Sequence, residues 1–317
     1  RPIRTSTHSP APTPRNACLS SLSPWWRCQT NTMKICGACE KELPKESFSG
    51  KQWKIRKSLR RCKVCVAAGN ELVLFTKGRE RSEDDECPIC SRLLPLENHE
   101  IMFRTCCMKA VCNGCALEAG MFHDCPFCRT PAPVSFEEEL SRIQKRVNTG
   151  DPEAIRLLGE SYMNGINGLE KDMLKAVEVL ERAAELGEKE AHGLLGELFD
   201  ENTDDWGIDK DMAGAVEHYE FAAKRGHALS RHNLGFIEHN KGNYGLARKH
   251  LMISAKLGFE PSLDEIENMH RWRMASKSDQ SSSARPRGPP GREAAGGPNS
   301  RRRRRRVLTP AEAHQRR

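Results

Sequence analysis

Residues 87–128 read CPICSRLLPLENHEIMFRTCCMKAVCNGCALEAGMFHDCPFC, and the eight cysteines in this stretch decide how it can fold. They fall into four tight groups with the spacing C-x2-C-x15-CC-x4-C-x2-C-x9-C-x2-C. A module of about forty residues buries too little apolar surface to fold alone, so bound metal must supply part of the folding free energy. The pattern predicts two zinc sites in which the cysteines are structural ligands.

The order of the four groups predicts how the two zinc ions share them. In a cross-brace, the first and third groups hold one ion, and the second and fourth groups hold the other. Interleaving the sites in this way ties distant parts of the chain together and makes a short segment rigid. The expected ligand sets are Cys87, Cys90, Cys112 and Cys115 for one ion, and Cys106, Cys107, Cys125 and Cys128 for the other.

Residues 86–129 resemble the RING family of ubiquitin ligases, most closely at Cys-Pro-Ile-Cys (87–90) and Cys-Pro-Phe-Cys-Arg (125–129). The resemblance implies that Ile89 and Pro126 form a shallow groove for a ubiquitin-conjugating enzyme. It also implies that Arg129 hydrogen-bonds both ubiquitin and that enzyme. A ligase of this family has no nucleophile of its own and acts by positioning and electrostatic preorganisation. We therefore expect contact residues here and no catalytic nucleophile.

The centre of this segment departs from the common RING pattern. That pattern has a histidine three residues before its fifth ligand, and the corresponding residue here is Lys109. A protonated lysine cannot coordinate zinc, so the fourth ligand must come from elsewhere. We expect the adjacent Cys106 to complete an all-cysteine set. His123, two residues before Cys125, is the rival candidate.

An earlier group of four cysteines predicts a third zinc ion. Its spacing, C-x2-C-x22-C-x2-C, fits one tetrahedral site with no open position for water, so this site is structural. Phe48 and Trp53 are the expected small core beneath the metal. The expected ligands are Cys36, Cys39, Cys62 and Cys65.

Residues 34–66 resemble the four-cysteine zinc domain named after a fungal adaptor that links RNA interference to heterochromatin. The resemblance rests on the two C-x2-C pairs, Leu43-Pro44, Phe48-Ser49 and Gln52-Trp53. It implies an adaptor or protein-binding role. The basic side chains of this stretch predict either a face for nucleic acid or an acidic partner, or a solvated surface; they are Lys51, Lys54, Arg56, Lys57, Arg60, Arg61 and Lys63.

Beyond the cysteines the sequence repeats itself. Lys171-Asp172-Met173-x-x-Ala176 recurs at residues 210–215, and Ala183-Ala184-x-x-Gly187 recurs at residues 222–226. A shorter third copy keeps Leu234-Gly235 and Ala255-x-x-Gly258. Such spacing, with small residues where helices approach closely, predicts paired antiparallel helices stacked as a solenoid. Before it, Ser135-x-x-Glu138 and the apolar spacing that follows predict a separate helix.

Residues 151–269 resemble Sel-1-like repeats, which are relatives of tetratricopeptide repeats. The resemblance rests on Leu-Gly in the first helix of each unit, an aspartate before the second helix, and the closing glycine. It implies a scaffold for protein complexes, as in adaptors of degradation ligases. Tyr162 and Tyr219 are expected in the core, and the concave face of the array is a candidate surface for a substrate or partner protein.

The charge and composition of the chain differ between its ends and its centre. The total charge is +8, but residues 285–317 contribute +9 and residues 1–32 contribute +4, which leaves the centre at about −5.

Zinc-type cysteine pairs indicate a reducing compartment, so we expect a cytoplasmic or nuclear location. Six consecutive arginines at residues 301–306 suit nuclear import or nucleic acid. No stretch has the roughly 18 apolar residues that a membrane-spanning helix needs.

These observations predict a mainly α-helical chain in which a repeat solenoid follows two small zinc-stapled modules. Translation from Met33 would make residues 1–32, with Cys18 and Cys28, a non-native leader; disorder and a transit peptide are the alternatives. Three functions compete: a RING-type ubiquitin ligase, a non-enzymatic scaffold, and a nucleic-acid adaptor. The expected segments are a leader at 1–32, a first cysteine module at 33–68, a linker at 69–84, a second cysteine module at 85–131, a linker helix at 132–150, repeats at 151–270 and a disordered Arg-rich tail at 271–317.

Overall fold

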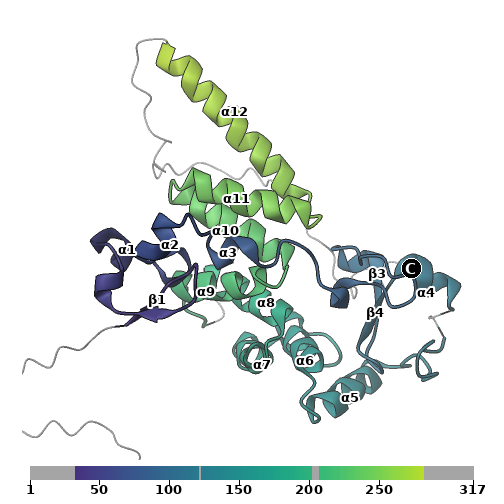
Figure 1. Ribbon diagram of the computed structural model, residues 1–317. Coiled ribbons are helices and arrows are strands. Elements are labelled where there is room, and N and C mark those ends of the chain that lie inside the picture. Colours follow the sequence, from purple (N-terminus) through teal and green to yellow (C-terminus); the bar gives the residue numbers. More distant parts are fainter. Residues whose placement is uncertain (1–32, 121–122, 202–206, 282–317) are drawn as a thin grey trace, which may run out of the picture.

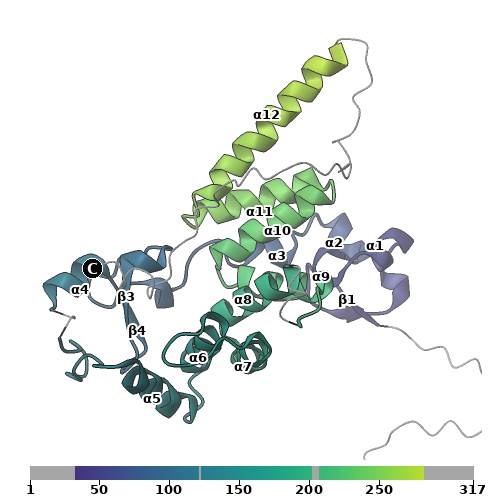
Figure 2. The ribbon, with the colours of Figure 1, turned by 180° about the vertical axis from the view of Figure 1, so that it is seen from behind.

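The computed structural model describes residues 33–120, 123–201 and 207–281, which form a mainly helical chain. A helical array lies between two small cysteine-rich modules, as both views show (Figure 1, Figure 2). This arrangement confirms the predicted fold class. The expected leader at 1–32 and the six arginines at 301–306 lie outside the described residues.

Helices of the array pack mainly in consecutive pairs, α6 with α7, α8 with α9 and α10 with α11. Helix α5 precedes them, and α12 follows. We expected the repeats to end at residue 270 and the tail to follow. Instead, the single helix α12 runs from Pro261 to Ser281. The bounds are α5 Phe136–Val147, α6 Pro152–Asn164, α7 Met173–Glu185, α8 Lys189–Asp200, α9 Met212–Ala223, α10 Ala228–Asn240, α11 Tyr244–Lys256 and α12 Pro261–Ser281.

The repeated residues have specific packing roles. Asp172 and Asp211 are the N-caps of α7 and α9, where their carboxylates accept backbone N–H groups. A Cβ at Gly159 would lie 2.7 Å from Leu180 Cγ, and one at Gly196 would lie 2.5 Å from the Tyr219 ring. Glycine therefore allows the two helices of a unit to approach closely. Tyr219 is buried in the core, as expected.

The first cysteine module consists of short elements around its metal-ligand candidates. Phe48 is buried among three of the cysteines, and its ring centroid lies 5.6 Å from that of Trp53, as predicted for the module core. The elements are β1 Lys34–Ile35, β2 Glu42–Leu43, η1 Lys45–Ser47, α1 Gly50–Lys54, η2 Lys57–Leu59 and α2 Lys63–Ala67. A linker with α3 Val73–Thr76 and η3 Glu83–Asp85 leads to the second module.

The second cysteine module is built on one β-hairpin and one short helix. Strand β3, Ile101–Arg104, pairs antiparallel with β4, Lys109–Cys112, and Ile101 lies opposite Cys112. Helix α4, Asn113–Glu118, begins directly after β4, and η4, Asn98–Glu100, precedes β3. Leu94, Val111 and Ala116 form its small apolar core together with Cys87.

Polar contacts fix the second module to the helices beside it. Arg146 of α5 donates to the carbonyl oxygen of Cys106 at 2.7 Å, and Arg142 donates to that of Pro131 at 2.8 Å. On the other side, Lys189 at the start of α8 pairs with Asp85 at 2.5 Å. The module is thus held at both of its chain ends.

Candidate metal centres

Three groups of four cysteines come together among the described residues. Within each group the Sγ atoms all lie within 4.8 Å of one another. The groups have the membership expected from the sequence, and His123 belongs to none of them. They are tetrad 1 (Cys36, Cys39, Cys62, Cys65), tetrad 2 (Cys87, Cys90, Cys112, Cys115) and tetrad 3 (Cys106, Cys107, Cys125, Cys128).

The sulfur spacing fits tetrahedral zinc. Zn–S bonds of about 2.3 Å in a tetrahedron place sulfurs about 3.8 Å apart. Cys90 Sγ lies 3.9 Å from Cys112 Sγ in tetrad 2, and Cys107 Sγ lies 3.7 Å from Cys125 Sγ in tetrad 3. Disulfide sulfurs would be about 2.05 Å apart. Four converging thiols with this spacing suit one zinc ion in each tetrad.

Each tetrad contains one knuckle with the same backbone geometry. The residue after the second cysteine of the knuckle has a left-handed φ: 55° at Glu40, 54° at Ser91 and 58° at Arg129. In each knuckle, that residue donates its N–H to the carbonyl oxygen of the first cysteine, at 2.8 Å. This turn brings both sulfurs of a C-x2-C pair to one side, so the three knuckles are equivalent turns that suit metal binding.

The other two cysteines are held by different structures in the three tetrads. Cys62 and Cys112 are the N-caps of α2 and α4, so in tetrads 1 and 2 a short helix supplies the other two thiols. Tetrad 3 has no such helix, because Cys106 and Cys107 lie in the turn between β3 and β4. The turn includes Met108 with a φ of 49°. Adjacent cysteines can thus contribute to one site because they sit in a tight hairpin turn.

Lys109, at the position of the usual RING histidine, points to a different neighbour. Its Nζ lies 4.4 Å from the centroid of the Phe127 ring, a cation–π contact. Lys109 therefore lies over an aromatic ring of the same module. The fourth member of tetrad 3 is Cys106, in place of the histidine that the common RING pattern has.

One thiol in each tetrad ionises more easily than an ordinary cysteine. Burial acts to raise the pKa of Cys36, but hydrogen bonds from backbone N–H groups, first that of Cys39, outweigh it and lower this pKa to about 6. The same balance lowers the pKa of Cys87 to about 6. The hydrogen bond with Thr130 is the main cause that lowers the pKa of Cys128 to about 6. Each tetrad can offer one thiolate near neutral pH, and zinc would displace protons from the others.

Two buried arginines precede tetrad cysteines in the chain. Arg60 lies two residues before Cys62 and Arg104 two residues before Cys106, and both are buried. Their Nε atoms have no hydrogen-bond partner. Burial lowers the pKa of Arg60, because the charged guanidinium group loses water.

Replacing Cys106 by alanine should lower the zinc content from three ions per chain to two, because tetrad 3 would keep only three thiols. Replacing His123 by alanine should leave three, because this exposed histidine lies outside the tetrads. Elemental mass spectrometry after dialysis against a weak chelator measures both values. Zinc loss in the His123 variant alone would reverse the assignment.

The residues expected to contact a conjugating enzyme lie on the two knuckles of the second module. Ile89 has 43% of its surface exposed, and Pro126 and Arg129 are also exposed. Leu117 on α4 is 70% exposed, more than Ile89. Leu117 was not among the contact residues predicted from the sequence, although its position two residues after Cys115 on a helix with few apolar residues was visible there.

The basic stretch of the first module does not form one exposed face. Arg56 pairs with Glu238 at 2.6 Å and with Glu220 at 3.0 Å, on α10 and α9. Arg60 is buried and donates to backbone carbonyl oxygens within its own module. Of the predicted basic residues, the ones left exposed are Lys51, Lys54, Lys57 and Lys63. Two glutamates of the repeat array thus serve as an acidic partner for this basic stretch.

Among the described residues, none of the helices is both long enough and apolar enough to cross a membrane.

Comparison with known families identifies the repeats. Residues 152–188 and 190–227 match the family described as Sel1 repeat. These residues span α6 to α9, so the match confirms the predicted repeat units there. The third unit, α10 with α11, lies beyond this match. No curated protein matches the chain.

Solved structures similar to the chain include two described as Sel1 or SLR proteins. A Sel1 repeat protein from Oxalobacter formigenes is 27% identical with a TM-score of 0.37, over 40% of this chain and 51% of that one. A protective antigen of uropathogenic Escherichia coli strains, displaying an SLR fold, is 23% identical with a TM-score of 0.40, over 44% of this chain and 30% of that one. The chain thus spans about half of the first structure and under a third of the second.

Proposed function

We propose that the protein is a RING-type ubiquitin ligase or ligase component. In this proposal the second cysteine module recruits a ubiquitin-conjugating enzyme, and the repeat array holds the substrate or a complex partner. The observation that carries it is the exposure of Ile89, Pro126 and Arg129 on two metal-binding turns of one module. Exposed apolar and cationic side chains on a rigid base are suited to docking and to orienting a thioester.

The attachment of the second module supports a role in positioning. Arg142 and Arg146 connect it to α5, and Lys189 connects it to α8. A conjugating enzyme on this module would therefore have a defined orientation toward anything bound on the repeats. Such an arrangement raises the effective concentration of a substrate near the thioester.

A non-enzymatic scaffold is the second candidate. Lys109 and the adjacent Cys106 and Cys107 depart from the common RING pattern, and Sel1 repeats by themselves fit protein–protein interaction. Nucleic-acid binding is a weaker candidate, because Arg56 and Arg60 of the first module are engaged within the protein. A cytoplasmic or nuclear location remains our expectation for each of these functions.

Full-length protein incubated with activating enzyme, ubiquitin and a panel of conjugating enzymes should form ubiquitin chains on itself. Ile89→Ala should abolish binding of the active conjugating enzyme. Arg129→Ala should slow discharge of the ubiquitin thioester by about 10-fold or more while changing binding less, because the side chain acts on the closed thioester. Arg92→Ala, an exposed arginine near the first knuckle, is the matched control. A metal-loaded chain that transfers ubiquitin with no enzyme of the panel would contradict the ligase proposal and favour the scaffold.

A further inference from the structure

The linker between the two cysteine modules lies on the C-terminal part of the repeat array. Helix α3 lies beside α10 in both views (Figure 1, Figure 2). Leu74 and Phe75 are 1% and 6% exposed and share an apolar cluster with residues of α10 and α11. We call the surface that receives them the linker-binding surface, made of Ala223, Ala228, Arg231, His250, Ile253 and Leu257.

Arg231 binds the backbone of the linker and not its side chains. Its guanidinium group is fully buried and donates to the carbonyl oxygens of Leu74 and Lys77, both at 2.6 Å. A hydrogen bond to a main-chain carbonyl does not depend on the side chain of that residue. Peptide-recognition sites obtain affinity from such main-chain bonds and specificity from pockets for selected side chains.

The side-chain requirements of the surface are specific. Phe75 packs on the His250 ring, with centroids 4.7 Å apart, and Leu74 lies in the same apolar cluster. A Cβ at Gly78 would overlap the carbonyl oxygen of Ala223, and its φ is +61°. The surface therefore selects the pattern Leu-Phe-x-x-Gly. Beside it, the carboxylates of Glu220 and Glu238 favour a basic group, which Arg56 supplies here.

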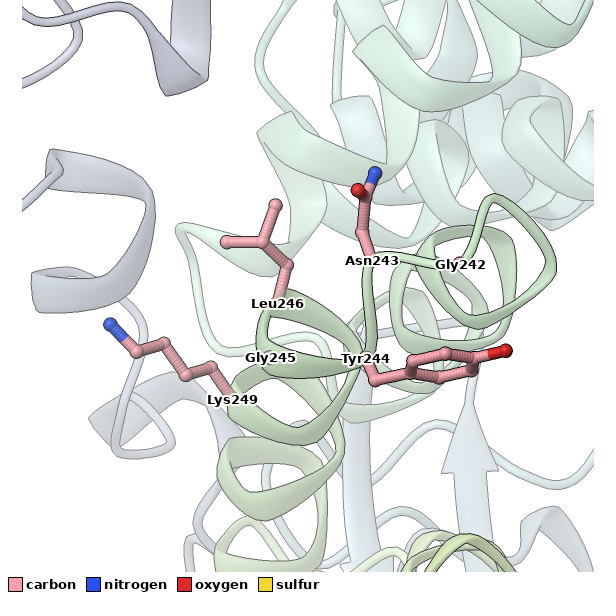
Figure 3. A pocket seen from close by; sticks show the side chains of 6 residues that line it. All are labelled: Gly242, Asn243, Tyr244, Gly245, Leu246 and Lys249. Atoms are coloured by element: carbon pink, nitrogen blue, oxygen red, sulfur yellow. The ribbon is translucent and has the colours of Figure 1, made fainter. Parts of the chain in front are cut away.

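Two features show that the linker does not fill or satisfy this surface completely. Both ring nitrogens of the buried His250 and the Nε of Arg231 have no hydrogen-bond partner, so the linker leaves polar groups unsatisfied. An open pocket of about 550 Å³ lies at the start of α11 (Figure 3). Its lining includes Leu246, which packs against the same cluster, and Lys249, whose Nζ lies 5.4 Å from the Phe75 ring centroid.

We propose that the linker-binding surface is a recognition site for short segments of partner proteins with the pattern Leu-Phe-x-x-Gly, and that residues 72–78 occupy it in cis. A partner with this pattern competes with the linker. When the partner binds, residues 72–78 leave the repeat array, so the linker no longer fixes the two cysteine modules to it. The proposal deepens the partner-binding role proposed for the repeats. It does not depend on ubiquitin transfer.

The test uses the full-length chain with zinc and a fluorescent peptide of residues 70–81, NELVLFTKGRER. The wild-type chain should bind it weakly, because the linker competes at a high effective concentration. The double variant Leu74→Ala/Phe75→Ala should bind it at least about 10-fold more tightly in fluorescence anisotropy. Thr76→Ala, an exposed change in the same helix, is the matched control and should behave as wild type.

Specificity is tested with one changed peptide and one further variant. The peptide with Gly78→Ala should lose binding, because the added Cβ overlaps Ala223. Adding Arg231→Gln to the double variant should also weaken binding, because the bonds to the peptide carbonyl groups are lost.

Equal affinity of wild type and double variant, with helical content and zinc content unchanged, would overturn the proposal, as would equal binding of the Gly78→Ala peptide. If the double variant does not fold, Gly78→Ala in the chain itself removes the linker by a backbone overlap and is measured instead. Failure of both variants to fold would show that the linker is an obligatory part of the repeat fold, and that result also overturns the proposal. Ubiquitin transfer does not enter any of these outcomes.

Discussion

Removal of metal by a strong chelator should unfold both cysteine modules and leave most of the helical signal. A structural zinc site contributes about 10–16 kcal/mol of apparent binding free energy at neutral pH, which is more than a module of this size gains from its apolar core. The cores are small: Phe48 and Trp53 in the first module, and three aliphatic side chains with a cysteine in the second. Helices α6 to α9 have apolar clusters of their own and should stay folded.

Hydrogen exchange read by mass spectrometry distinguishes these parts of the chain. After chelation, amides of residues 34–66 and 87–131 should exchange at rates near those of an unfolded chain. Amides of α6 to α9 should keep most of their protection. Returning zinc should restore the original pattern. Unchanged protection of the two modules in a demonstrably metal-free chain would contradict a structural role for the tetrads.

The substitution Arg56→Met should destabilise the repeat array by about 3 kcal/mol. It leaves Glu238, whose side chain is 1% exposed, without its cation, and removing one partner of a buried pair costs about 3–5 kcal/mol. The Arg56 side chain is 27% exposed, which places the expected effect at the lower end of that range. Glu220 also loses its ion pair, and burial already raises the pKa of this carboxyl.

Urea denaturation at saturating zinc, followed by far-ultraviolet circular dichroism, measures this effect on the helices. Lys57→Met is the matched control, because Lys57 is the exposed neighbour of Arg56 and forms none of the ion pairs found among the described residues. We expect the control to change the free energy of unfolding by less than about 0.5 kcal/mol. Equal stability of the two variants would show that Arg56 does not couple the first module to the array.

Local sequence patterns predicted the parts of this protein that depend on local geometry. The recurrence of Asp172 and Asp211 identified helix starts, because an aspartate N-cap bonds to backbone groups within a few residues. Gly159 and Gly196 marked the close approach of paired helices. Cysteine spacing predicted the membership of the tetrads, because five of the six cysteine pairs are C-x2-C knuckles and the alternating order of the groups assigns the sixth, Cys106-Cys107, to the last knuckle.

The contacts between modules were beyond the reach of the sequence. Arg56 and Glu238 are 182 residues apart in the chain, and neither residue type nor spacing indicates that they meet. The basic stretch of the first module predicted either a face for nucleic acid or an acidic partner, or a solvated surface, whereas Arg56 binds carboxylates of the same chain. Leu74 and Phe75 likewise gave no periodic signal, because α3 is only four residues long and its burial depends on α10 and α11.

The number of zinc ions bound to the full-length chain tests the central claim most directly, since the tetrads position both the first module and the proposed ligase surface. Elemental analysis of protein purified at neutral pH with trace zinc should give three ions per chain, one for each tetrad. A chain with folded repeats and fewer than three ions would contradict the account.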